Sequence, residues 1–213
     1  MGQLIVTEFV TLDGIAQAPG GPDEDAEHGF GFGGWQAPLI EEQSGPAMFE
    51  KARGMDALLL DRKTYDIFAG DRPNAPEEIP FTGLLNRVPK YVASHTLSGP
   101  LSWNGATVLD GDVVDAVTEI TARHDAVHVI GSLDLLQSLL AARLVDRLEL
   151  WIYPVLVGTG KRVFEPGTLP TAFGVAEAVT YPNGTVSLSL APNGAPNSGD
   201  MTVDEPHLRQ GDK

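Results

Sequence analysis

Short apolar segments of strand length alternate with segments that have the spacing of amphipathic helices, and this alternation limits the possible folds more than any other feature. The strands are expected at residues 3–10, 57–60, 91–93, 107–109, 127–130 and 148–153. The helices are expected at residues 46–53, 62–69, 113–124 and 133–142, the third capped by Asp112. Because a helix between two strands usually joins them in parallel, we predict an α/β fold with a mostly parallel central sheet and flanking helices.

The last part of the chain departs from this pattern. Residues 173–181 and 185–190 are strand-like and flank a Pro-Asn-Gly turn, which predicts an antiparallel C-terminal hairpin at the edge of the sheet. From residue 192 onward, Asn, Gly, Pro and charged residues follow one another without periodicity. We therefore predict one domain at residues 1–191 and a flexible polar tail at residues 192–213.

The acidic composition restricts the possible partners. The 213 residues include 14 Lys and Arg against 29 Asp and Glu, which gives a net charge of −15. Such a surface repels phosphate backbones, so we expect no nucleic-acid partner. An anionic ligand would need a local cluster of basic residues. A small molecule is the expected ligand.

Other classes of protein and site are excluded by what the sequence lacks. No apolar run approaches the roughly 20 residues of a membrane span, and no basic stretch precedes the first apolar run, so we expect a cytoplasmic protein. The chain has no Cys, which removes disulfides and thiolate sites. Its His, Asp and Glu residues show no metal-ligand spacing, and we predict no metal.

A long loop at residues 18–38 is rich in Gly and Pro and carries the acids Asp23, Glu24, Asp25 and Glu27. Loops of this length inside a domain are usually lids or disordered insertions. Trp35, near its end, could be a lid over a substrate or an anchor of the loop in the core.

Several motifs occur in a fixed order along residues 4–190. They are TLDGIA (residues 11–16), LLDRKTY (59–65), KYVASHTL (90–97), GSLDL (131–135) and LVDRL (144–148) followed by PVLVGTGKRVF (154–164). In this order they resemble the motifs of the riboflavin-biosynthesis reductase C-terminal domain family, relatives of dihydrofolate reductase, and most of all its stand-alone actinobacterial-type branch. The resemblance implies a dihydrofolate reductase-like fold, a homodimer, and NADPH-dependent reduction of a small heterocyclic or carbonyl substrate.

The resemblance also implies where the cofactor would bind. In this fold the C-terminal ends of parallel strands meet at one edge of the sheet, where helix N-termini offer N–H groups to a pyrophosphate. The implied cofactor residues are Arg62, Lys63 and Thr64 at one turn, Gly131, Ser132, Leu133 and Asp134 at the other, Ser94 and His95 by the adenosine, and Gly14, Ile15 and Ala16 by the nicotinamide. The implied substrate residues are Val10, Met48 and Phe49, with Asp13 and Trp35 as catalytic candidates.

The sequence departs from the family at both phosphate turns. Asp61 and Leu133 stand where the family usually has glycine, which permits positive φ and close approach of the backbone to a phosphate. A carboxylate about 4 Å from a phosphate also adds repulsion of roughly 1 to 4 kcal/mol. A second function is therefore open: a scaffold that has lost dinucleotide binding through Asp61 and Leu133, and uses the same pocket for a non-redox reaction or for ligand binding.

Several of these residues also have an ordinary structural interpretation. Asp61 and Asp134 could be N-caps of their helices, and Arg62 and Lys63 could form a solvated helix start. Asp13 could simply belong to a turn with Gly14, and His95 to a polar turn.

Overall fold

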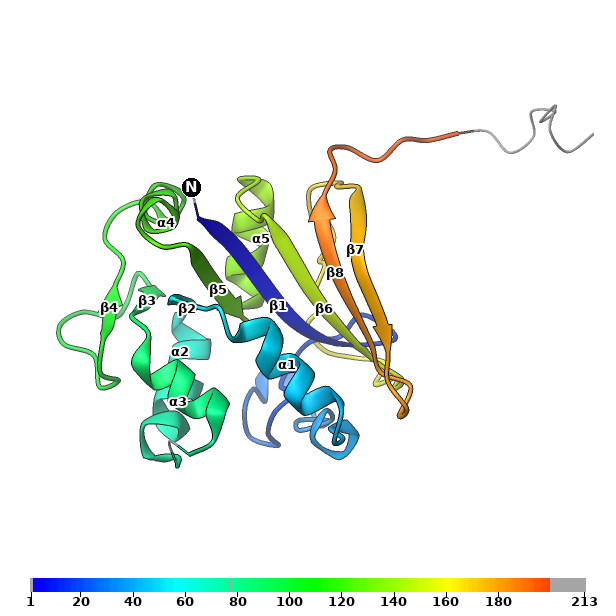
Figure 1. Ribbon diagram of the computed structural model, residues 1–213, viewed down its shortest axis with the longest axis horizontal. Coiled ribbons are helices and arrows are strands. Elements are labelled where there is room, and N and C mark those ends of the chain that lie inside the picture. Colours follow the sequence, from blue (N-terminus) through cyan, green and yellow to red (C-terminus); the bar gives the residue numbers. More distant parts are fainter. Residues whose placement is uncertain (1, 77, 200–213) are drawn as a thin grey trace, which may run out of the picture.

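Eight strands form one twisted sheet in the computed structural model, which describes residues 2–76 and 78–199 (Figure 1). The strands are β1 (Gln3–Thr11), β2 (Ala57–Asp61), β3 (Lys90–Ala93), β4 (Ala106–Val108), β5 (Ala126–Ile130), β6 (Arg147–Tyr153), β7 (Phe173–Thr180) and β8 (Val186–Pro192). Their order in the sheet is β4-β3-β2-β5-β1-β6-β8-β7. Strands β1 to β6 pair in parallel, whereas β8 pairs antiparallel with both β6 and β7. The predicted mostly parallel sheet with an antiparallel C-terminal hairpin is confirmed.

Five α-helices connect the strands within residues 2–76 and 78–199. They are α1 (Ser44–Ala52), α2 (Arg62–Asp71), α3 (Pro80–Arg87), α4 (Val113–Arg123) and α5 (Leu133–Ala141). Short 3-10 turns occur at Glu27–Gly29, Ala37–Leu39 and Arg72–Asn74. Asp112 caps α4 as predicted, because its carboxylate accepts the N–H groups of Val114 and Asp115. The sequence did not predict α3, a short helix that begins at Pro80 and contains Gly83, a poor helix former.

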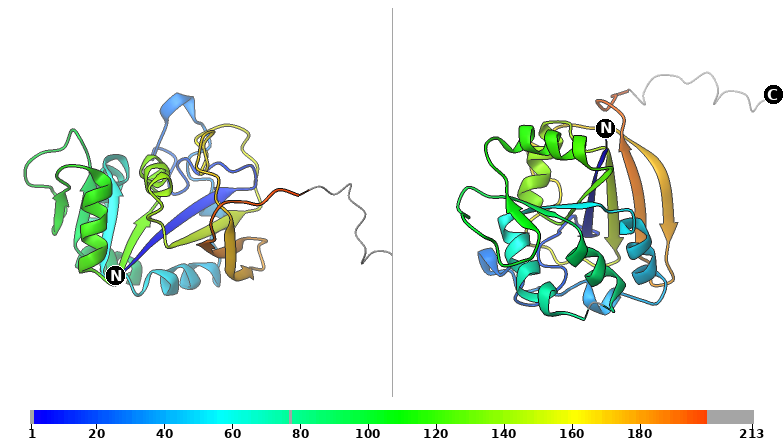
Figure 2. Two further views of the ribbon diagram at one scale, coloured as in Figure 1. Left: turned by 90° about the horizontal axis from the view of Figure 1, so that it is seen from above. Right: turned by 60° about the vertical axis from the view of Figure 1, so that its left-hand side comes forward.

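The helices cover both faces of the sheet (Figure 2), and an apolar core lies under the helices of each face. A third apolar cluster packs around Trp35, Trp151 and Tyr153. Helices α4 and α5 pack on one face with Leu59 and Val129, whereas α1, α2 and α3 contribute to the core on the other face with Leu58 and Leu60. This division follows from strand geometry, since successive side chains of a strand point to opposite faces.

The strand order creates a crevice. Strands β2 and β5 are neighbours, but the helix that follows β2 packs on one face and the helix that follows β5 packs on the other. At such a switch point the chain leaves the sheet in opposite directions, and ligands of open α/β sheets bind outside the carboxyl ends of the strands there.

The hairpin and the sheet edges bear on the remaining predictions. The β7–β8 turn closes with a hydrogen bond from the Tyr181 N–H to the Thr185 carbonyl, and Gly184 adopts a φ of +86°. The sheet ends at β4 and β7. The homodimer stays a prediction. Most of the predicted tail, residues 200–213, lies outside the described residues. None of the helices in the described ranges is long and apolar enough to cross a membrane.

Candidate functional site

A cavity of about 730 Å³ lies at the C-terminal ends of β1, β2 and β5, where the strand order predicts a crevice. Its walls come from residues 16–25 of the long loop, the start of α2 and the turn at residues 130–134. The larger apolar side chains in the walls are Phe9, Ile40, Met48, Ile67, Phe68, Phe81, Ile130 and Leu133. The cavity is thus an apolar space bounded by two helix N-termini and an acidic loop.

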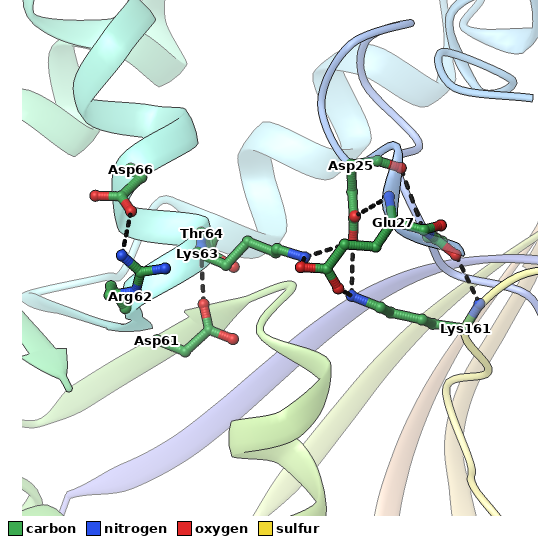
Figure 3. Close-up of polar contacts among 9 residues, drawn as sticks. Asp25, Glu27, Asp61, Arg62, Lys63, Thr64, Asp66 and Lys161 are labelled. Carbon is green, nitrogen blue, oxygen red and sulfur yellow. Dashed lines mark hydrogen bonds and ion pairs between the residues drawn. The ribbon is translucent and has the colours of Figure 1, made fainter. Parts of the chain in front are cut away.

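At the first turn, the start of α2 is capped by Asp61. Its backbone is extended, with φ −78° and ψ 173°, and its carboxylate accepts the Thr64 N–H at 2.7 Å (Figure 3). The Asp61 N–H in turn donates to the Ser132 Oγ at 3.0 Å, which ties the two turns together. The N-cap interpretation of Asp61 is confirmed, and a phosphate at this helix start would have to compete with the carboxylate for the same N–H.

At the second turn, the start of α5 is not capped by a side chain. Gly131 and Ser132 both have a φ of +68°, and Ser132 occupies the N-cap position without a side-chain cap hydrogen bond. Leu133 and Asp134 are the first residues of the helix. The expectation that Leu133 blocks a positive φ is therefore wrong, because that conformation falls one residue earlier. The N-cap interpretation of Asp134 is also wrong, because Ser132 occupies the N-cap position and Asp134 lies inside the first turn of the helix.

Two lysines beside the cavity are held by acids of the long loop. The Lys63 Nζ lies 3.0 Å from Asp25 and 2.6 Å from Glu27, and the Lys161 Nζ lies 2.8 Å and 2.6 Å from the same two residues (Figure 3). Although burial acts to raise the pKa of Asp25, hydrogen bonds from Lys161, the Glu27 N–H and Lys63 lower it to about 2. The two carboxylates are therefore ionised at neutral pH and neutralise both lysines.

The loop is fixed by two further residues. The Gln17 amide donates to the carbonyl oxygens of Asp25 and Glu27, at 3.1 Å and 3.2 Å, and accepts the Lys161 N–H at 2.9 Å. The Trp35 Nε1 donates to the Gln17 carbonyl at 2.9 Å, and its ring packs edge-on against Tyr153. Trp35 is buried and does not line the cavity, so the structure places it as an anchor of the loop in the core.

Asp13 holds a different loop. Its carboxylate accepts the Thr11 hydroxyl and the N–H groups of Val157 and Gly158, the last at 2.7 Å. The hydrogen bond from Thr11 is the main cause that lowers the pKa of Asp13. Asp13 does not line the cavity, and its hydrogen bonds join the β1 turn to the segment after β6.

The cavity brings together part of the predicted set. The predicted residues that line it are Ala16, Met48, Lys63, Thr64, Gly131, Ser132, Leu133 and Asp134. The predicted residues outside its lining are Val10, Asp13, Gly14, Ile15, Trp35, Phe49, Arg62, Ser94 and His95. Arg62 faces solvent and pairs with Asp66 at 3.6 Å. His95 is exposed in the turn after β3, and Ser94 accepts N–H groups within that turn.

A buried acid is among the cavity residues that were not predicted from the sequence. Glu8 lies on β1 and is 2% exposed. It is the one acid in residues 4–11, where all other residues are apolar or Thr. Burial and the charge of Asp61 raise the pKa of Glu8 to about 8. An acid inside a strand whose neighbours Val6 and Val10 are core residues was the signal that could have revealed it.

Solved structures share this architecture at low sequence identity. A predicted riboflavin biosynthesis protein from Shewanella sp. PV-4 is 19% identical, with a TM-score of 0.65 over 90% of this chain and 99% of the other. A pyrimidine reductase-like protein from Corynebacterium diphtheriae is 13% identical, with a TM-score of 0.60 over 90% and 92% of the two chains. Dihydrofolate reductase from Enterococcus faecalis, complexed with NADP(H), is 15% identical, with a TM-score of 0.54 over 90% and 97%. These similarities show the fold.

Comparison of the sequence itself gives the family. No curated protein matches the chain. The model of the RibD C-terminal domain matches residues 3–187, nearly the whole of the sheet and its helices. This match confirms the resemblance found in the ordered motifs, and the chain belongs to the RibD C-terminal domain family.

Proposed function

We propose that the protein is an NADPH-dependent reductase of a small heterocyclic or carbonyl substrate. The cavity at the switch point carries this proposal, because it joins an uncapped helix N-terminus to a pair of lysines that already bind anionic oxygens. The family and its fold are those of reductases, which supports the reaction class.

The residues present fit a phosphate-bearing cofactor if the acidic loop moves. The carboxylates of Asp25 and Glu27 stand in for phosphate oxygens, since they occupy both lysine ammonium groups at hydrogen-bond distance. Lys63, Lys161 and the backbone of Gly131 and Ser132 would hold the phosphates once these carboxylates are displaced. The cofactor, when bound, supplies the hydride.

The protein's own contribution to such a reaction is positioning and exclusion of water. The rings of Phe9, Phe68 and Phe81 line the cavity and can pack against flat substrates. The acidic lining disfavours a phosphorylated substrate, because like charges repel strongly in a partly desolvated space. A small, uncharged or cationic ring is the substrate class that these walls favour.

A second candidate is favoured by the start of α2. Asp61 already satisfies the Thr64 N–H that a pyrophosphate would use, and its charge opposes a phosphate at that place. A cofactor-independent enzyme or a ligand-binding protein on the same scaffold would use the cavity without the dinucleotide.

Titration with NADPH and NADH separates the two candidates. A dissociation constant below about 50 μM stabilises the fold by more than about 1 kcal/mol at millimolar cofactor, which thermal unfolding detects. We expect stabilisation of the wild type, and a larger effect in the double variant Asp25→Asn/Glu27→Gln, because the phosphates then no longer compete with ionised carboxylates.

Asp23→Asn is the matched control for that titration. Asp23 belongs to the same loop and lines the same cavity, but it makes no ion pair within the described ranges. No stabilisation of the wild type or of the double variant at millimolar NADPH would contradict the reductase proposal and leave the second candidate.

We further expect a cytoplasmic homodimer that binds no nucleic acid. Size-exclusion chromatography with light scattering checks the oligomeric state, and a mass near the 22.7 kDa of one chain would contradict the dimer.

A further inference from the structure

Glu8 is an ionisable residue of the cavity that the proposed reduction does not use. It lines the cavity from β1, is almost completely buried, and its Oε1 has no hydrogen-bond partner among the residues that the structure describes. Buried polar groups nearly always have a partner, because leaving one unpaired lowers stability. A ligand in the cavity is the group that could complete the hydrogen bonds of this carboxyl.

The other charges around the cavity show what kind of ligand would be stable there. Five further acids line it: Asp23, Glu24, Asp25, Asp61 and Asp134. The cations that line it are Lys63, Arg72 and Lys161, and both lysines are already bound to Asp25 and Glu27. A concave site with an excess of one charge concentrates ligands of the opposite charge.

The walls and the placement of the acids favour an organic cation. Aromatic rings pack against flat ligands and attract cations to their faces, and Phe9 and Phe81 line the cavity, whereas the Phe68 ring already has the Arg72 guanidinium 5.5 Å from its centre. Within residues 2–76 and 78–199, no group of three or more His, Asp or Glu side chains is close enough to hold a metal ion. Among these residues the acids that line the cavity form no metal-binding group, and the apolar walls favour an organic cation over a hydrated ion.

We propose that the cavity binds a small planar organic cation, such as an amidinium or a protonated nitrogen heterocycle, and that the Glu8 carboxylate anchors it. This goes beyond the reductase proposal, since it concerns the ligand of the apolar part of the cavity and holds with or without a dinucleotide.

Binding of a cation is coupled to the proton of Glu8. Because burial and then the charge of Asp61 raise the pKa of Glu8 to about 8, the carboxyl is neutral at neutral pH until a cation binds. The charged groups that line the cavity around it are Asp61 from β2, Lys63 from α2, Arg72 after α2, Asp134 from α5, and Asp23, Glu24, Asp25 and Lys161 from loops. A cation that pairs with ionised Glu8 must therefore displace its proton below about pH 8.

Three probes of one shape test the proposal. Benzamidine, benzamide and benzoate are planar molecules that are cationic, neutral and anionic, and isothermal titration calorimetry in two buffers measures both affinity and proton release. We expect benzamidine to bind about tenfold or more tightly than benzamide, and benzoate not to bind. Its affinity should rise about 25-fold from pH 6.5 to pH 8.5 as Glu8 ionises, with release of a proton at the lower pH.

Glu8→Gln keeps the shape and removes the charge. It should abolish the preference for benzamidine, its pH dependence and the proton release. The matched control is Glu119→Gln, an exposed acid of α4 away from the cavity, which should change none of these. Equal binding of benzamidine and benzamide, or an unchanged preference in Glu8→Gln, would overturn the proposal.

If Glu8→Gln does not fold, the benzamidine titration of the wild type tests the proposal by itself. Circular dichroism checks folding, and a wild-type benzamidine affinity that neither rises with pH nor releases a proton overturns the proposal. The NADPH titration is separate, so loss of cofactor binding and loss of cation binding are distinguished.

Discussion

Two strand-to-helix turns meet at the cavity, and they differ in how the helix start is satisfied. At α2 the carboxylate of Asp61 accepts the Thr64 N–H, and Lys63 is bound by Asp25 and Glu27. At α5 the Ser132 side chain makes no cap hydrogen bond, and its Oγ accepts the Asp61 N–H instead. The free N–H groups at a helix start in this fold can thus bind a carboxylate of the chain itself or remain available to an external anion.

The largest expected effect concerns Glu8, which shares the cavity with both turns and feels the charge of Asp61. Its pKa is raised from 4.5 to about 8, so between these pH values the unfolded chain loses the proton and the folded chain keeps it. Folding is then opposed increasingly as pH rises, by on the order of 4 kcal/mol above pH 8. Glu8→Gln should therefore gain stability over the wild type through this window.

Urea unfolding of both proteins from about pH 4 to pH 9 measures this gain. A stability difference that stays constant across the whole range would show that the pKa of Glu8 is the same in the folded and unfolded chain, so that neither burial nor Asp61 raises it.

A smaller effect distinguishes Asp61 and Leu133, the two residues that the resemblance to the family places where glycines are expected. Leu133→Gly should lower the free energy of unfolding by about 1 kcal/mol or more, because Leu133 is helical and packs against the core. Asp61→Gly should cost only a few tenths of a kcal/mol, since glycine is a tolerated N-cap. Urea unfolding compares the two variants. A larger loss of stability in Asp61→Gly than in Leu133→Gly would show that the N-cap hydrogen bond of Asp61 stabilises the fold more than the packing of Leu133 does.

The smallest effect is expected at the exposed side of α2. Arg62 pairs with Asp66 in solvent, so Arg62→Ala should change stability by less than about 1 kcal/mol and leave NADPH affinity unchanged. Thermal unfolding with and without NADPH checks both. A marked loss of NADPH affinity would restore Arg62 as a phosphate ligand and make the α2 turn more open than Asp61 suggests.

Local sequence patterns predicted the fold well but only part of the site. The strand pattern and the Asn-Gly turn were sufficient for the sheet and the hairpin, because each depends on neighbouring residues. The short helix α3 was missed, since Pro80 and Gly83 interrupt its pattern. The first residue of α5 was predicted correctly, but the positive φ was expected at residue 133 and is carried by Ser132, an unusual residue for that conformation.

The charged contacts of the site were beyond such patterns. Lys161 meets Asp25 and Glu27 across more than a hundred residues of sequence, and only the folded chain brings them together. Glu8 was not predicted as a cavity residue, because it lies in a mostly apolar strand. Its burial beside the cavity follows only from the folded chain.

The central claim is that carboxylates of the chain itself close the α2 turn to phosphate, whereas the α5 turn is open. Calorimetric titration of NADPH into the wild type, Asp61→Gly and Leu133→Gly tests it most directly. We predict that Asp61→Gly binds NADPH about tenfold or more tightly than the wild type, because a repulsive charge is removed, and that Leu133→Gly gives no such gain. Equal affinity of Asp61→Gly and the wild type, or a gain in Leu133→Gly instead, would contradict the account.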